Sequence, residues 1–175
     1  GNVVGSNNYS WAITQAAGSN YSIKVVSDSD GLIFDESPTF TIVAPTISVS
    51  SSNINQFDDL DISWSVSGSI SNKATIAVVE NSQSANVTDG STTYSFATDS
   101  SATWSPGTYT ITATSIDQPT ISDSTTVTIS ASSISGVNAG NANQFDTLAV
   151  TWTEAGTIGA TVTVTATNGG FSQSA

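Results

Sequence analysis

Apolar and polar residues alternate along most of the chain, and this pattern predicts strands. In residues 60–66 the apolar positions are Leu60, Ile62, Trp64 and Val66, with polar residues between them. Three further apolar rows show the same period: Ala74, Ile76 and Val78; Tyr109, Ile111 and Ala113; Val127 and Ile129. A period of two places apolar side chains on one face of a strand. No segment shows a helical period, so we expect an all-β protein.

The chain also contains an internal repeat. Residues 55–64 read NQFDDLDISW and recur at residues 143–152 as NQFDTLAVTW, an offset of 88 residues. Residues 21–25 match residues 109–113 at the same offset. Matched landmarks at one offset indicate a repeating structural unit of about 88 residues.

Each unit contains about seven short strands, which is typical of an immunoglobulin-like β-sandwich. The fold class that we expect is therefore all-β, with tandem sandwich repeats. Because the chain has no cysteine, aromatic side chains must hold the core in place of disulfides. The expected core anchors are the four tryptophans, Trp11, Trp64, Trp104 and Trp152.

The repeat is out of phase with the ends of the sequence. Residues 45–131 contain a complete unit. Residues 1–44 (the N-terminal segment) resemble a second half, and residues 132–175 (the C-terminal segment) a first half. Half a sandwich exposes an apolar face and unpaired strand edges. We expect a neighbouring copy to complete each half, through direct continuation of the chain or through strand complementation between subunits.

Charge excludes several classes of partner. The chain has 14 acidic and 2 basic residues, for a net charge of -12. Such a chain repels phosphate backbones and anionic membrane surfaces, so we expect no nucleic-acid partner. No segment is long and apolar enough for a transmembrane helix, so we expect no membrane insertion.

The residue types argue against catalysis. Without histidine or cysteine, nucleophilic triads and the usual zinc sites are impossible. The acidic clusters Asp35-Glu36 and 58–61 could formally provide the carboxylates of a glycosidase. However, adjacent strand residues point to opposite faces, and the second copy keeps only Asp123 and Asp146. We expect no enzymatic activity and no cofactor.

Two other features leave alternatives open. In residues 28–31, Asp28 and Asp30 alternate before a glycine, as in a calcium loop, but the remaining ligands are lacking. A plain turn is the interpretation that we favour, and calcium binding stays open.

The glycosylation candidates are the sequon asparagines Asn8, Asn20 and Asn86. Outward threonine rows could carry O-linked sugar, or the polar faces could be unmodified.

Four strand motifs carry a family resemblance: LDISWSVSG at 60–68, YSWAI at 9–13, GSNYSIKV at 18–25 and IFDESPTFTI at 33–42. They resemble the Ser-Thr-rich glycosylphosphatidylinositol-anchored membrane protein family, which includes yeast cell-wall proteins of the Kre and Knh type. The copy at 121–129 departs from this pattern by lacking the glutamate and the proline. The resemblance implies an extracellular, wall- or surface-associated sandwich module without catalytic residues.

Together these patterns predict a structural role. We expect a subunit or repeat of an extracellular filament, stalk or cell-surface fibre, assembled head to tail from neighbouring copies. The alternative is an adhesin or cell-wall polysaccharide-binding module that uses loop-tip residues such as Tyr94 or Phe96. Exposed, clustered aromatic side chains would favour binding, whereas aromatic side chains within the core would favour the structural role.

Overall fold

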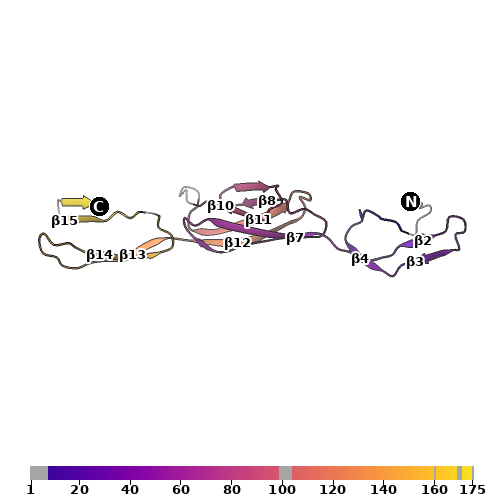
Figure 1. Cartoon of the computed structure of the whole chain (residues 1–175), viewed down its shortest axis with the longest axis horizontal. Coiled ribbons are helices and arrows are strands. Elements are labelled where there is room, and N and C mark those ends of the chain that lie inside the picture. The colour runs from indigo at the N-terminus through magenta and orange to yellow at the C-terminus, as the bar shows by residue number, and fades with distance from the viewer. Residues whose placement is uncertain (1–7, 99–103, 160, 169–170, 175) are drawn as a thin grey trace. The chain divides into compact units, whose positions relative to one another are not determined.

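A computed structural model of the chain describes residues 8–98, 104–159, 161–168 and 171–174, and these contain strands, turns and loops but no helix (Figure 1). The chain divides into two compact units, Gly1–Pro45 and Thr46–Ala175.

Residues 46–130 form two sheets, which together we call the central sandwich (Figure 1). The three-stranded sheet has the order β10-β7-β5, with bounds Thr93–Phe96, Leu60–Ser67 and Thr46–Ser51. The five-stranded sheet has the order β6-β12-β11-β8-β9, with bounds Ile54–Asn55, Ser122–Ser130, Gly107–Ser115, Ala74–Val78 and Gln83–Val87. Neighbouring strands are antiparallel except β6 and β12, which are parallel.

The core of the central sandwich consists of the apolar rows predicted from alternation. Its members are almost completely buried, including Leu60 and Ile62 of β7, Ala74, Ile76 and Val78 of β8, Tyr109, Ile111 and Ala113 of β11, and Val127 and Ile129 of β12. Burial of one face drives strand formation here, because each apolar side chain leaves water while the alternating polar one stays in it. The predicted strand faces are confirmed.

Two tryptophans occupy this core. Trp64 is 4% exposed and Trp104 is 2% exposed. The Trp64 indole Nε1 donates a hydrogen bond to the Asn72 carbonyl at 2.8 Å, so its polar atom is satisfied despite burial. Trp104 packs against Tyr109 and Phe96, with ring centroids 5.4 and 6.0 Å apart.

The C-terminal segment forms two strand pairs, β13 with β14 and β15 with β16, with bounds Ser133–Ala139, Val150–Ala155, Thr165–Asn168 and Phe171–Ser174. The first pair repeats β5 and β7. Asn138 opposite Thr151 corresponds, at the offset of 88, to Ser50 opposite Ser63. The register then shifts by one residue near Gly136, whose φ of 59° marks an inserted residue.

The N-terminal segment also forms two strand pairs, β1 with β4 and β2 with β3, with bounds Gly18–Tyr21, Phe40–Ile42, Lys24–Val26 and Phe34–Glu36. The second pair repeats β11 and β12, since Val25 opposite Asp35 corresponds to Ala113 opposite Asp123. In β1, Asn20 has a φ of 65° at a register shift.

A turn within the matched NQFD motif is repeated as well. The Asp58 carboxylate accepts a hydrogen bond from the Asn55 backbone N–H at 3.0 Å, and the Asp146 carboxylate accepts one from Asn143 at 3.2 Å. The phenylalanines before the two aspartates have φ angles of 74° and 75°. Strand pairing and turn geometry therefore both follow the 88-residue offset.

Candidate assembly interface

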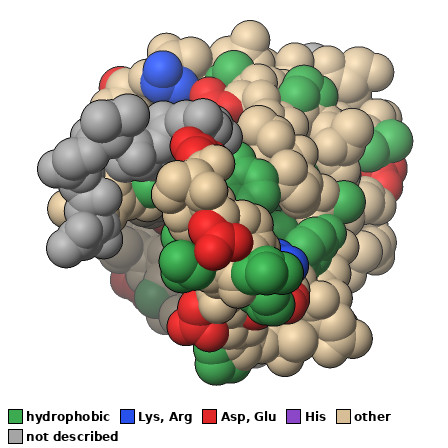
Figure 2. Space-filling model, turned by 90° about the vertical axis from the view of Figure 1, so that its right-hand side faces the viewer, with side chains coloured by type: hydrophobic (Ala, Val, Ile, Leu, Met, Phe, Trp, Pro, Cys, Tyr) green, Lys and Arg blue, Asp and Glu red, His purple; other side chains and the backbone are tan. Residues whose placement is uncertain are grey.

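Large apolar side chains lie exposed mainly outside the central sandwich. Among the described residues, the N-terminal segment carries ten: Tyr9, Trp11, Ile13, Ile23, Val25, Val26, Leu32, Ile33, Phe34 and Val43. The described side chains of the C-terminal segment include four: Ile134, Val137, Phe145 and Leu148. Those of the central sandwich, which is larger than either segment, include one, Val79. Figure 2 shows apolar side chains at the surface beside acidic ones. Such concentrated apolar exposure indicates an interaction surface.

The exposed residues of β2 and its flanks are the equivalents of a buried strand. Ile23 and Val25 correspond to Ile111 and Ala113 of β11, which are both 0% exposed. Ile23 and Val25 are 42% and 70% exposed. In the central sandwich, β11 lies beside β8, and no part of the N-terminal segment matches β8 in sequence. The N-terminal segment therefore has this apolar face but lacks the strand that lies beside it in the sheet.

Trp11, one of the expected core anchors, is 50% exposed within the single chain. Residues 9–12, YSWA, match residues 94–97, YSFA, at an offset of 85, so the equivalent of Trp11 is Phe96 of β10. Phe96 is 7% exposed, packs against Trp104 and lies on a strand that pairs with β7, and no segment of residues 8–44 corresponds to β7. Trp11 thus lacks the neighbouring strand within its own unit.

The C-terminal segment shows the complementary situation. Leu148 is 47% exposed, whereas its equivalent Leu60 is fully buried. Trp152 is half-buried, and its Nε1 donates to the Glu154 carboxylate at 2.7 Å. Its equivalent Trp64 donates to a backbone carbonyl inside the core. These residues form an apolar face equivalent to that of β7, which in the central sandwich is paired with β10.

The C-terminal segment also contacts the NQFD turn of the central sandwich. The Thr157 hydroxyl donates to the Asp58 carboxylate, and the Ser132 hydroxyl donates to the Gln56 carbonyl at 3.2 Å. Gly156, with a φ of 73°, lies so close that an added Cβ would meet the Asn55 side chain at 3.1 Å. The absence of a side chain at Gly156 permits this approach.

The Asp58 contact predicts a pH dependence. Hydrogen bonds from the Thr157 hydroxyl and from the Asn55 backbone lower the pKa of Asp58 below its ordinary value of 3.8. A lowered carboxyl pKa means that the contact contributes stability above the ordinary pKa and loses it as pH falls through the lowered pKa. We expect NMR titration of the Asp58 carboxyl group to show this lowered pKa, and Thr157→Ala to raise it. An unchanged Asp58 midpoint in the variant would contradict the contact.

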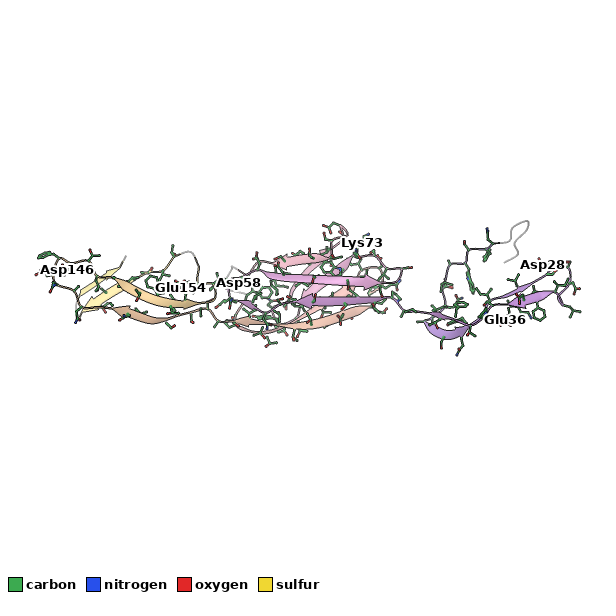
Figure 3. All side chains as sticks on the ribbon, turned by 60° about the horizontal axis from the view of Figure 1, so that its bottom comes forward. Asp28, Glu36, Asp58, Lys73, Asp146 and Glu154 are labelled. Atoms are coloured by element: carbon green, nitrogen blue, oxygen red, sulfur yellow. The ribbon has the colours of Figure 1, made fainter. Side chains whose placement is uncertain are left out.

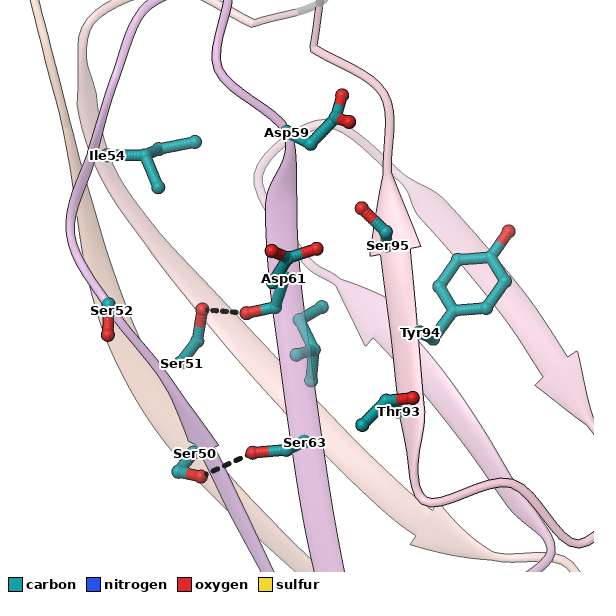
Figure 4. A pocket seen from close by; sticks show the side chains of 11 residues that line it. Ser50, Ser51, Ser52, Ile54, Asp59, Asp61, Ser63, Thr93, Tyr94 and Ser95 are labelled. Carbon is teal, nitrogen blue, oxygen red and sulfur yellow. Dashed lines mark hydrogen bonds between the residues drawn. The ribbon is translucent and has the colours of Figure 1, made fainter.

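A polar groove of about 800 Å³ lies over the sheet β10-β7-β5 (Figure 4). Ser50 and Ser63 share a hydrogen bond of 2.9 Å at its floor, and Asp59 and Asp61 line it. The repeat replaces these carboxylates with Thr147 and Ala149. The groove is therefore specific to one unit, and the repeat does not preserve it as a carboxylate pair.

The sequon asparagines Asn8, Asn20 and Asn86 are all exposed. Asn86 lies on β9, at the edge of the five-stranded sheet, and its side-chain Oδ1 accepts a hydrogen bond from Thr75 at 2.8 Å. In the sequon of Asn20, the Ser22 hydroxyl donates to the Glu36 carboxylate. Exposure meets one physical requirement for sugar attachment at each position.

Asp28, labelled in Figure 3, lies in the turn between β2 and β3. Asp30 lies in the same turn. Asp30 Oδ1 accepts a hydrogen bond from the Leu32 N–H at 2.9 Å, and the Asp30 carbonyl accepts one from Ile33 at 3.0 Å. The equivalent turn, in which Ile121 donates to the Gln118 carbonyl at 2.9 Å, has one acidic residue fewer. The described residues include no cluster of three or more histidine, cysteine or acidic side chains able to hold a metal.

Comparisons with protein-family models, with curated proteins and with solved structures return no significant match. In the described part of the chain, no helix has the length and apolar character needed to cross a membrane.

Proposed function

We propose that the protein is a structural subunit of an extracellular fibre, assembled head to tail from immunoglobulin-like sandwich units. One observation carries this proposal: the two end segments expose the apolar faces whose equivalents the central sandwich buries. Ile23 is 42% exposed where Ile111 is buried, and Leu148 is 47% exposed where Leu60 is buried. One segment contains late strands and the other contains early strands, so the two are complementary halves.

The aromatic side chains of the central sandwich support a structural role over a binding role. Trp64, Trp104 and Phe96 are buried in its core. Tyr94 is half-buried and packs edge-on against Phe96, with ring centroids 4.9 Å apart. Aromatic residues used for core packing leave no cluster on this unit for stacking against sugar rings.

The surface chemistry fits an extracellular location. Three exposed sequons can accept sugars, and acidic residues outnumber basic ones by 14 to 2. An acidic, glycosylated surface keeps neighbouring fibres apart through like-charge repulsion. The sequence resemblance to Ser-Thr-rich cell-wall proteins agrees with this location.

A head-to-tail contact uses two different surfaces, so each added copy presents a new free surface, and growth is open-ended where the rotation between copies does not close a ring. We expect light scattering of the purified chain to rise with protein concentration and electron microscopy to show fibres. Added salt should promote assembly, because it screens the repulsion between copies that each carry a net charge of -12. A monomer at every concentration, or a closed dimer, would contradict the proposal.

Denaturing electrophoresis of native material distinguishes the two routes of assembly. A very large species would indicate one continuous covalent array. A band near 17.8 kDa would indicate separate subunits joined by strand complementation.

A further inference from the structure

We propose that residues 9–27 of one copy lie beside residues 148–166 of a second copy, in the same register that joins β10 to β7 and β11 to β8. This inference rests on the proposed head-to-tail assembly and adds its partner strands, residue by residue. The central sandwich supplies the template, because it contains both halves in one continuous chain.

The first pairing follows from β11 and β8. In the central sandwich, Ala113 lies opposite Ile76 and Thr114 lies opposite Thr75. The offset of 88 converts these pairs into Val25 opposite Val164 and Val26 opposite Thr163. The apolar alternation is kept, since Val25 and Val164 fall on the core side. Val25, which is 70% exposed, would then have an apolar cross-strand neighbour, as Ala113 has in Ile76.

The offset is justified on both sides of this pairing. On one side, Val25 and Asp35 keep the register of Ala113 and Asp123. On the other side, β15 and β16 repeat the pairing of β8 and β9 with two extra residues between the strands: Thr165 opposite Ser174 corresponds to Ala77 opposite Ser84, at offsets of 88 and 90. Each half thus already has the strand arrangement of the central sandwich up to the edge where the other half would join.

The second pairing follows from β10 and β7. Phe96 lies opposite Leu60 in the central sandwich. The equivalent pair is Trp11 opposite Leu148, which are 50% and 47% exposed. Similarly, Tyr94 opposite Ile62 becomes Tyr9 opposite Val150. Trp11 takes the place of Phe96 in this pair, and the partner is a leucine in both cases. The contact between an aromatic and an aliphatic side chain is therefore kept.

Two polar contacts across the central sandwich are also kept in sequence. The Asp123 carboxylate accepts a hydrogen bond from the Val49 N–H at 2.9 Å, and the Asn53 side chain accepts one from the Thr128 N–H at 2.8 Å. At the offset of 88, Asp123 corresponds to Asp35 in the N-terminal segment, and Asn53 corresponds to Asn141 in the C-terminal segment. Asp35 belongs to one half and its expected donor, Val137, belongs to the other. Within its own segment, Asp35 Oδ1 accepts a hydrogen bond from the Glu36 N–H at 2.9 Å, and the Val137 N–H would be a further donor when two copies meet.

The absence of cysteine in the chain allows a direct test by disulfide trapping. Two single variants, Val26→Cys and Thr163→Cys, are mixed at equal concentration under oxidising conditions. Directly opposite Cα atoms lie about 4.5–5.5 Å apart, within the range of a disulfide. We expect a cross-linked dimer that forms only in the mixture. The double variant Thr75→Cys/Thr114→Cys, at the equivalent pair of the central sandwich, is the positive control for disulfide formation.

The matched register control mixes Val26→Cys with Thr165→Cys, two residues after Thr163 in the chain. Its diagonal separation of about 7–8 Å is too long for a disulfide, so we expect at least several-fold less dimer. Dimer yield equal to or above that of the matched pair would overturn the register. No dimer from either mixture, with the positive control oxidised, would also overturn it. Light scattering on the same samples shows separately whether assembly itself, and hence the proposed function, has failed.

Discussion

Replacing Trp11 with aspartate should abolish fibre assembly while the central sandwich stays folded. In the proposed contact, Trp11 faces Leu148 of the next copy, and an aspartate there would bury a carboxylate among apolar side chains without a partner. An uncompensated buried charge costs about 3–5 kcal/mol. Association should therefore weaken by roughly a hundredfold to several thousandfold, which analytical ultracentrifugation over a concentration series can measure.

Two control variants separate this effect from general changes in charge. Val79→Asp adds the same charge at an apolar residue that is 62% exposed on the central sandwich, outside both end segments, and should leave assembly intact. Trp11→Phe should also assemble, because phenylalanine occupies the equivalent position at Phe96. Normal fibres from Trp11→Asp would contradict the proposed contact.

Truncating Trp64 to alanine should destabilise the central sandwich by about 3–5 kcal/mol in its free energy of unfolding. The side chain is 4% exposed, so its loss leaves a large cavity between the sheets. It also removes the hydrogen bond that the Trp64 indole donates to the Asn72 carbonyl. Urea unfolding followed by near-ultraviolet circular dichroism measures this change.

The matched comparison is Trp11→Ala in dilute, unassembled protein. Because Trp11 is 50% exposed there, the same truncation should change unfolding by only about 0.5 kcal/mol or less. Equal losses from Trp64→Ala and Trp11→Ala would show that the two tryptophans are packed alike, against the structure.

The strand faces were predictable from sequence because burial acts on every second residue. The row from Leu60 to Trp64 and the row from Ala74 to Val78 needed no tertiary information. The inserted residues at Asn20 and Gly136 were not predictable in this way. A positive φ in a strand changes the register by one residue without disturbing the sequence repeat around it.

The candidate interface could be predicted in outline from the sequence. The phase of the repeat indicates two uncovered halves, and the match of YSWA with YSFA relates Trp11 to Phe96. The contact between Asp58 and Thr157 had no sequence signal, since a hydrogen bond between residues 99 positions apart follows from how the strands are placed and not from periodicity.

The parallel pairing of β6 with β12 joins the first and last parts of the central sandwich. Ile54 and Asn55 lie beside Ile129 and Ser130, and the Gln56 N–H donates to the Ser130 carbonyl at 2.8 Å. In a parallel pair, the start of the first strand and the end of the second strand lie at opposite ends of the pair. Tension on the chain would therefore pull the two strands past each other. The hydrogen bonds between them would be loaded in shear and at the same time. Such a unit resists stretching until several bonds break at once, so a fibre built from it would be mechanically strong along its axis.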